Sequence, residues 1–127
     1  MIFFIHGDVG YNIIEFIIKK YPKDIKIIFV KKINIQFKNR LKKKLPNVKY
    51  YKWSDKKEKK IIKLIKFINA KLIFLLWWPK IISRKLIKSV DSNCINIHPS
   101  YLPYFKGKDP NFWSILSNGP FGVSIHY

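Results

Sequence analysis

Cysteine is almost absent from this sequence, and so are long apolar runs. Cys94 is the single cysteine, so the chain can form no internal disulfide, and no spacing of cysteine and histidine resembles a zinc site. Lys or Pro interrupts every apolar stretch before it reaches the roughly 20 residues that a membrane-spanning helix needs. The first apolar run, residues 1–5, has no basic leader and is too short for a signal peptide, so we expect a cytoplasmic protein without a membrane or metal partner.

Acidic residues are also scarce. The 7 Asp and Glu face 26 Lys and Arg, which gives a formal net charge of +19 and invites a nucleic-acid-binding interpretation. Against it, arginine occurs only at Arg40 and Arg84, and the chain is also rich in Ile, Asn, Phe and Tyr, a composition typical of AT-rich coding DNA. We favour a solvated lysine-rich surface, while electrostatic steering of an anionic substrate stays open as the alternative.

What is present is enough apolar material for a core. Hydrophobic residues make up 48% and aromatic residues 17% of the 127 positions, far from the composition of a disordered chain. There is no internal repeat and no linker, so residues 1–127 are expected to form one domain.

Apolar runs alternate with amphipathic stretches, which indicates βαβ units and an α/β fold: an open, mainly parallel twisted sheet with helices on both faces. The expected strands span residues 2–6, 25–30, 48–53, 71–78 and 94–97, with a last strand from residue 122. Asp55 and Glu58 have the spacing of a capping box, which predicts the start of a helix whose apolar face comprises residues 61, 62, 64, 65 and 68. Further helices are expected around residues 13–18, 37–45, 83–90 and 110–117.

Ligands of open α/β sheets bind beyond the carboxyl ends of the strands, so three segments need scrutiny. Residues 7–10, Gly-Asp-Val-Gly, lack the full dinucleotide-binding pattern and are interpreted as a tight turn from strand to helix. Trp77 and Trp78 end a strand, where they can belong to the core or bind a planar ligand, and both alternatives stay open.

The third segment is different in kind. Asn96 and His98 are two residues apart at the end of a strand, so their side chains are expected on one face. Pro99 and Pro103 stiffen the loop that follows, and Gly107 relaxes the backbone where the chain turns back. A histidine satisfied in the core is the plain alternative, but rigid loops with clustered polar groups are typical places for chemistry.

The run from Asn96 to Gly107, Asn-Ile-His-Pro-Ser-Tyr-Leu-Pro-Tyr-Phe-Lys-Gly, resembles the signature loop of the formyltransferase superfamily that uses 10-formyltetrahydrofolate. The resemblance continues through residues 110–115 and 121–126, and residues 72–82 are similar to the segment that lines the folate pocket of that family. Residues before 72 agree in pattern only. The resemblance implies a Rossmann-like formyltransferase fold, C-terminally incomplete in this chain, and 10-formyltetrahydrofolate as cosubstrate without a metal.

Formyl transfer needs a hydrogen-bond donor for an oxygen that gains negative charge and a base for the attacking amine. The resemblance gives these roles to Asn96, whose amide donates without changing charge, and His98, since imidazole ordinarily titrates near neutral pH. It further implies residues that border the folate, namely Ser100, Tyr101, Leu102 and Pro103 together with Trp77, Trp78 and Ile82. The acceptor substrate would lie near Tyr104, Lys106 and Gly107.

The resemblance is nearest to enzymes that formylate the amino group of a nucleotide-linked sugar. A methionyl-tRNA formyltransferase-like fragment and a non-catalytic basic nucleic-acid-binding module are the alternatives. The resemblance implies a catalytic set completed by an Asp in an Asp-x-Gly turn after the strand that begins at Gly122, and the sequence stops before that turn. We therefore expect little or no activity from the 127-residue chain alone.

Overall fold

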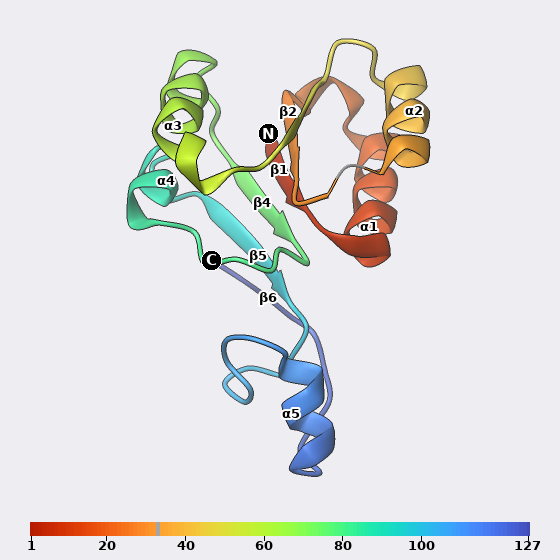
Figure 1. Cartoon of the computed structure of the whole chain (residues 1–127), viewed down its shortest axis with the longest axis vertical. Coiled ribbons are helices and arrows are strands. Elements are labelled where there is room, and N and C mark those ends of the chain that lie inside the picture. Colours follow the sequence, from red (N-terminus) through yellow and green to blue (C-terminus); the bar gives the residue numbers. More distant parts are fainter. Residues whose placement is uncertain (33) are drawn as a thin grey trace.

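The computed structural model describes residues 1–32 and 34–127, which form one six-stranded sheet in the order β3-β2-β1-β4-β5-β6 (Figure 1). The strands are β1 (Ile2–Ile5), β2 (Ile27–Val30), β3 (Lys49–Lys52), β4 (Ile73–Leu76), β5 (Cys94–His98) and β6 (Ser124–His126). All neighbouring pairs run parallel except β5 and β6, which are antiparallel. The expected α/β class with a mainly parallel sheet is confirmed.

Helices cover both faces of the sheet. Their bounds are α1 (Gly7–Lys20), α2 (Ile35–Lys44), α3 (Glu58–Phe67), α4 (Arg84–Lys88) and α5 (Pro110–Leu116), with short 3-10 turns at Pro22–Asp24 and Asp55–Lys57. In Figure 1, α1 and α2 lie on one side of the sheet, whereas α3 and α4 lie on the other. Two separate apolar clusters, one under each helix pair, follow from this arrangement.

The central strand shows how the sequence builds both clusters at once. Ile2 and Phe4 of β1 point into the cluster under α3 and α4, while Phe3 and Ile5 point into the cluster under α1 and α2. All four side chains are fully buried. A strand buried on both faces needs a continuous apolar run, and each such side chain contributes about 1.5–3 kcal/mol through burial.

The capping box expected at Asp55 and Glu58 is wrong. Asp55 starts a 3-10 turn and accepts hydrogen bonds from Trp53 and Lys80, while Glu58 accepts one from Ser83 at 2.5 Å. Neither side chain caps α3, since Lys57 is the N-cap residue and makes no side-chain cap. Partners distant in the sequence outcompete the local pairing that the spacing suggests.

The passage from β1 to α1 is tight, as expected, but it takes place at His6 and Gly7 rather than over residues 7–10, because α1 begins directly at Gly7. Gly7 has φ +62°, which lets the chain reverse without a connecting loop. Gly10 is buried where the first turn of α1 crosses β4, and a Cβ there would lie 2.7 Å from the Leu76 carbonyl oxygen. The glycines therefore serve a close approach of helix and sheet.

The fourth strand is shorter than expected. It ends at Leu76 rather than before Pro79, because Trp77 adopts φ +59° and leaves the extended conformation. Its centre is buried as predicted.

In the described part of the chain, no helix is both long and apolar enough to cross a membrane.

The segment after β5 stands apart from the other layers. Figure 1 shows α5 beyond the end of β5, away from the other four helices. Pro110 and Ser114 are its buried residues, and the large side chains Phe112, Trp113, Ile115 and Leu116 are exposed. The helix is anchored by the Ser114 hydroxyl, which donates to the carbonyl oxygens of Gly119 and Pro120 at 3.2 and 3.0 Å.

Candidate active site

The end of β5 carries Asn96 and His98. Cys94, two residues before Asn96, belongs to the cluster under α3 and α4, while Ile97 packs against the opposite cluster. The alternation of a strand therefore places both polar side chains on the face of α3 and α4, as the spacing predicts. Both residues are half-buried.

The neighbouring strand β6 matches this polar pair with one of its own. The antiparallel register pairs Asn96 with His126 and His98 with Ser124. Ser124-Ile125-His126 has the same polar-apolar-polar alternation as Asn96-Ile97-His98, and this repeated pattern is the signal by which Ser124 and His126 could have been found. Sequence reasoning missed both residues.

One N–H of the Asn96 amide is occupied. Its Nδ2 lies 3.2 Å from Nε2 of His126, and Nδ1 of His126 lies 2.9 Å from the Tyr127 backbone oxygen. Because the amide nitrogen can only donate and the backbone oxygen can only accept, His126 has its proton on Nδ1. A primary amide has two N–H groups, so Asn96 retains a second donor.

His98 is held by the loop that it precedes. Its Nε2 lies 3.3 Å from the Phe105 carbonyl oxygen, which only accepts, so Nε2 has the proton and Nδ1 is the nitrogen that can accept another. Throughout residues 1–32 and 34–127, no carboxylate forms a hydrogen bond or ion pair with His98. The imidazole is oriented by a backbone carbonyl.

Ser124 ties the loop to β6. Its hydroxyl donates to the Ser100 carbonyl oxygen at 2.7 Å and accepts from the Leu102 amide at 2.9 Å. The chain then turns through a cis peptide bond between Leu102 and Pro103. These contacts explain how a mostly exposed loop is kept next to the end of β5.

The predicted substrate residues line the outer side of this loop. Tyr104, Lys106 and Gly107 are exposed, and Gly107 adopts φ +95° where the chain turns. The rings of Tyr101 and Tyr104 stack with centroids 6.4 Å apart and an interplanar angle of 20°. The loop thus presents an aromatic surface to solvent, beside Pro103, which is also exposed.

The predicted folate residues before β5 lie in two environments. Trp78 is buried in the core, with its ring centroid 5.3 Å from that of Phe4 and 6.0 Å from that of Trp53. Ile82 is half-buried against the same cluster, and Trp77 is half-buried at the strand end. Of the two alternatives left open for the tryptophan pair, Trp78 is a core residue.

Two predicted folate residues carry buried polar atoms that lack a partner within the described residues. They are the Nε1 atom of Trp78 and the hydroxyl oxygen of Ser100, which together make up half of the four such atoms found there. Buried polar groups are nearly always hydrogen-bonded, so each of these atoms can take a partner from a ligand or water.

The chain is an open α/β domain with a hydrogen-bond donor, Asn96, and an acceptor, His98, at the end of the interior strand β5. A family model described as "Formyl transferase" matches residues 19–127. The chain belongs to the formyl transferase family.

Among its relatives, a methionyl-tRNA formyltransferase of Prochlorococcus marinus is 39% identical over 61 residues, which cover 48% of this chain and 18% of the relative. One of Clostridium botulinum is 33% identical over 61 residues, covering 48% and 20%. A solved phosphoribosylglycinamide formyltransferase of Anaplasma phagocytophilum superposes with a TM-score of 0.78 at 20% identity, covering 99% of this chain and 62% of that one. The matches therefore span about a fifth of these curated relatives and less than two thirds of the solved structure, whose likeness shows the fold.

Proposed function

We propose that this chain takes part in the transfer of a formyl group from 10-formyltetrahydrofolate to an amino group. One observation carries the proposal: Asn96 and His98 lie on the same face at the end of β5, one with a free N–H donor and the other with a free ring nitrogen. Membership of the formyl transferase family supports it.

The two side chains supply complementary chemistry. The second N–H of Asn96 donates to the formyl oxygen as that oxygen gains negative charge, and such a donor is worth about 3 kcal/mol in the transition state. Nδ1 of His98 accepts the proton that the attacking amine loses, while the Phe105 carbonyl holds the ring in place. The amine nitrogen bonds to the formyl carbon of the cosubstrate, the bond from that carbon to the folate nitrogen breaks, and that nitrogen takes up a proton, so that tetrahydrofolate leaves.

The residues present fit a folate. Ser100 offers an unpartnered hydroxyl inside the loop, and Tyr101 offers an exposed ring on which a planar heterocycle can stack. Leu102 and Pro103 complete the apolar border. Trp78 takes part through its unpartnered indole N–H, because its ring is buried among other aromatic side chains.

For the acceptor we propose the amino group of a nucleotide-linked sugar, which would contact Tyr104, Lys106 and Gly107. These residues are exposed on the loop that follows His98, and Lys106 matches the negative charge of such a substrate. Methionyl-tRNA is the second candidate acceptor. The two curated relatives reported above are named methionyl-tRNA formyltransferases, and the net charge of +19 suits a polyanionic substrate.

Binding of tetrahydrofolate tests the proposal without requiring turnover. We expect saturable binding of tetrahydrofolate by calorimetry, with at least tenfold weaker affinity in Tyr101→Ala and no change in Tyr21→Ala, a tyrosine of similar exposure (55% against 50%) in a distant part of the chain. Absence of saturable binding, or equal loss in both variants, contradicts the proposed cosubstrate.

Formyl transfer is then assayed with a nucleotide-linked amino sugar and with methionyl-tRNA as alternative acceptors. The chain alone is expected to show little or no transfer. Any rate that it does show should fall by about 10²–10⁴-fold in His98→Ala, the usual contribution of a general base, and should stay unchanged in His6→Ala. Formylation of the tRNA in preference to the sugar would reject the sugar as acceptor. Transfer that survives His98→Ala would reject the assigned base.

A further inference from the structure

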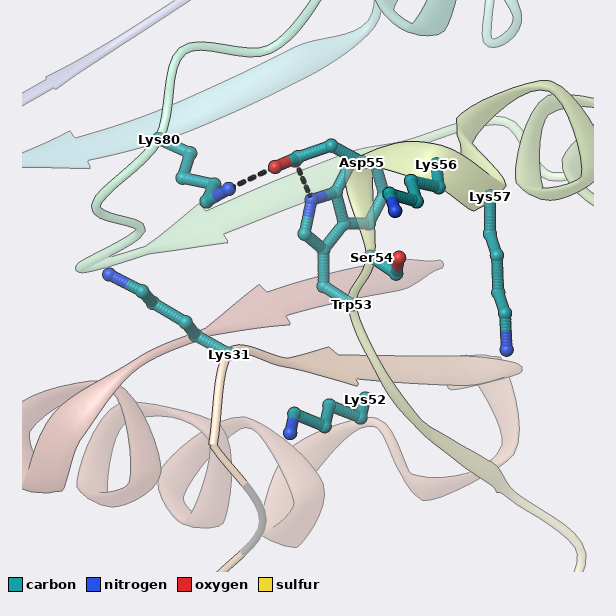
Figure 2. A pocket seen from close by; sticks show the side chains of 8 residues that line it. All are labelled: Lys31, Lys52, Trp53, Ser54, Asp55, Lys56, Lys57 and Lys80. Atoms are coloured by element: carbon teal, nitrogen blue, oxygen red, sulfur yellow. Dashed lines mark hydrogen bonds and ion pairs between the residues drawn. The ribbon is translucent and has the colours of Figure 1, made fainter.

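A second concave region lies away from the His98 loop. It is a pocket of about 510 Å³ at the carboxyl ends of β2 and β3 and beside the loop after β4 (Figure 2). The described residues that line it are Lys31, Lys52, Trp53, Ser54, Asp55, Lys56, Lys57 and Lys80. From Val30 on β2 to Ile97 on β5 is three strand steps, about 14 Å at the usual spacing of roughly 4.8 Å.

The pocket is far more basic than the chain as a whole. Lysine fills five of the eight lining positions, whereas Lys and Arg together account for 26 of the 127 residues. Lys80 pairs with Asp55; elsewhere in the described chain, no carboxylate lies within 4.0 Å of Lys31, Lys52, Lys56 or Lys57. The lining therefore combines four unpaired ammonium groups with one neutralised pair.

The acidic member of that pair is held in place. Asp55 accepts a hydrogen bond from the indole N–H of Trp53 at 2.6 Å and another from Lys80. Figure 2 shows this pair together with Lys31, which follows β2, Lys52 at the end of β3 and the lysines of the 3-10 turn, with the ammonium groups apart from one another.

Lysines from several segments that line one cavity are suited to a compact, highly charged anion. A lysine acts as a point charge toward phosphate, and its flexible stem lets the ammonium follow the ligand. The volume lies within the range of small-molecule sites, and the place, beyond the carboxyl ends of parallel strands, is where such sheets bind ligands. A single phosphate would leave most of four positive charges unmatched, whereas a diphosphate matches them more closely.

We propose that this pocket is a binding site for a diphosphate group, either free or as part of a nucleotide, and that Lys31, Lys52, Lys56 and Lys57 hold it. The proposal does not depend on formyl transfer, because the pocket contains none of the residues assigned to that reaction.

Calorimetric titration of the chain with inorganic pyrophosphate at low ionic strength tests it. We expect one saturable site, and at least tenfold weaker affinity in the double variant Lys31→Gln/Lys52→Gln. The control is Lys19→Gln/Lys63→Gln, which removes the same charge from exposed positions on α1 and α3 and should change the affinity less than threefold. All four lysines are exposed, so folding is not at risk.

Asp55→Asn should change the pyrophosphate affinity in the opposite direction to the lysine variants. It removes the one negative charge that lines the pocket and frees Lys80, so pyrophosphate should bind more tightly. Weaker binding in Asp55→Asn, no saturable site, or equal weakening in both lysine pairs overturns the proposal.

A parallel titration with uridine diphosphate distinguishes a nucleotide ligand from free diphosphate. Tighter binding than that of pyrophosphate, still lost in Lys31→Gln/Lys52→Gln, identifies a nucleotide, and equal binding identifies the free anion. If Lys31 and Lys52 are needed for a short single-stranded RNA but not for pyrophosphate, the pocket is a phosphodiester contact and the proposal fails.

Discussion

Ser124→Ala tests the contact that holds the catalytic loop against β6. The substitution removes a hydroxyl that makes two hydrogen bonds, one to the Ser100 carbonyl oxygen and one from the Leu102 amide. Each bond is worth about 1 kcal/mol net, and the deleted group leaves both backbone partners in a partly buried place. We expect a loss of about 2 kcal/mol in the free energy of unfolding, or roughly 6–12 °C in Tm for a chain of this size.

Urea unfolding followed by circular dichroism measures the loss, and hydrogen exchange locates it. The Leu102 amide should exchange at least tenfold faster in Ser124→Ala, since about 1.4 kcal/mol corresponds to a factor of ten. Ser117→Ala is the matched control, because its exposed hydroxyl makes one local bond to the Trp113 carbonyl oxygen, and such surface changes stay within about 0.5 kcal/mol. If Ser124→Ala is no more destabilising than Ser117→Ala, or leaves Leu102 exchange unchanged, the loop is not held in this way.

Two further predictions concern the packing and the charge near β1. Gly10→Ala should destabilise the fold by about 1–3 kcal/mol in urea unfolding, since its Cβ would lie 2.7 Å from the Leu76 carbonyl oxygen and α1 would have to move; an unchanged or raised midpoint would show that the helix yields without cost. Burial, and then the charges of Lys31 and Lys32, hold the pKa of His6 below its ordinary value of 6.5, so the unfolded chain binds more protons below that pH. The stability that neutral His6 contributes is therefore present above about pH 6.5 and is lost as the pH falls below it. In His6→Gln, the urea midpoint should depend less on pH between about 7.5 and 5. The same slope in both proteins would exclude His6 as its source.

Much of the architecture could be predicted from local patterns. The continuous apolar runs at β1, β2 and β4 predict strands buried on both faces, and the structure buries them so. Ser83, expected near the start of a helix, is the N-cap of α4 and accepts from the Leu86 amide at 3.1 Å. Element boundaries were less accurate, since the end of β4 depends on the positive φ of Trp77.

Part of the candidate site could also be predicted from a local pattern. The alternation of a strand alone places Asn96 and His98 on one face. By contrast, the Phe105 carbonyl reaches His98 through the conformation of the loop, and His126 reaches Asn96 through the antiparallel register of β6. Asp55 was assigned a local cap, yet it bonds Lys80, 25 residues later in the chain.

The sequence by itself determined the alternation of strands and helices, the polar pair at the end of β5 and the resemblance carried by residues 96–107. Tertiary structure alone decided which side chains meet: Trp78 enters the core, Ser124 anchors the loop, and lysines that follow β2, end β3 and lie in the loop after β4 line one pocket. The physical reason is the distance along the sequence over which each kind of interaction acts. Periodicity and turn chemistry act over a few residues, whereas strand order and register bring together groups that no local pattern relates.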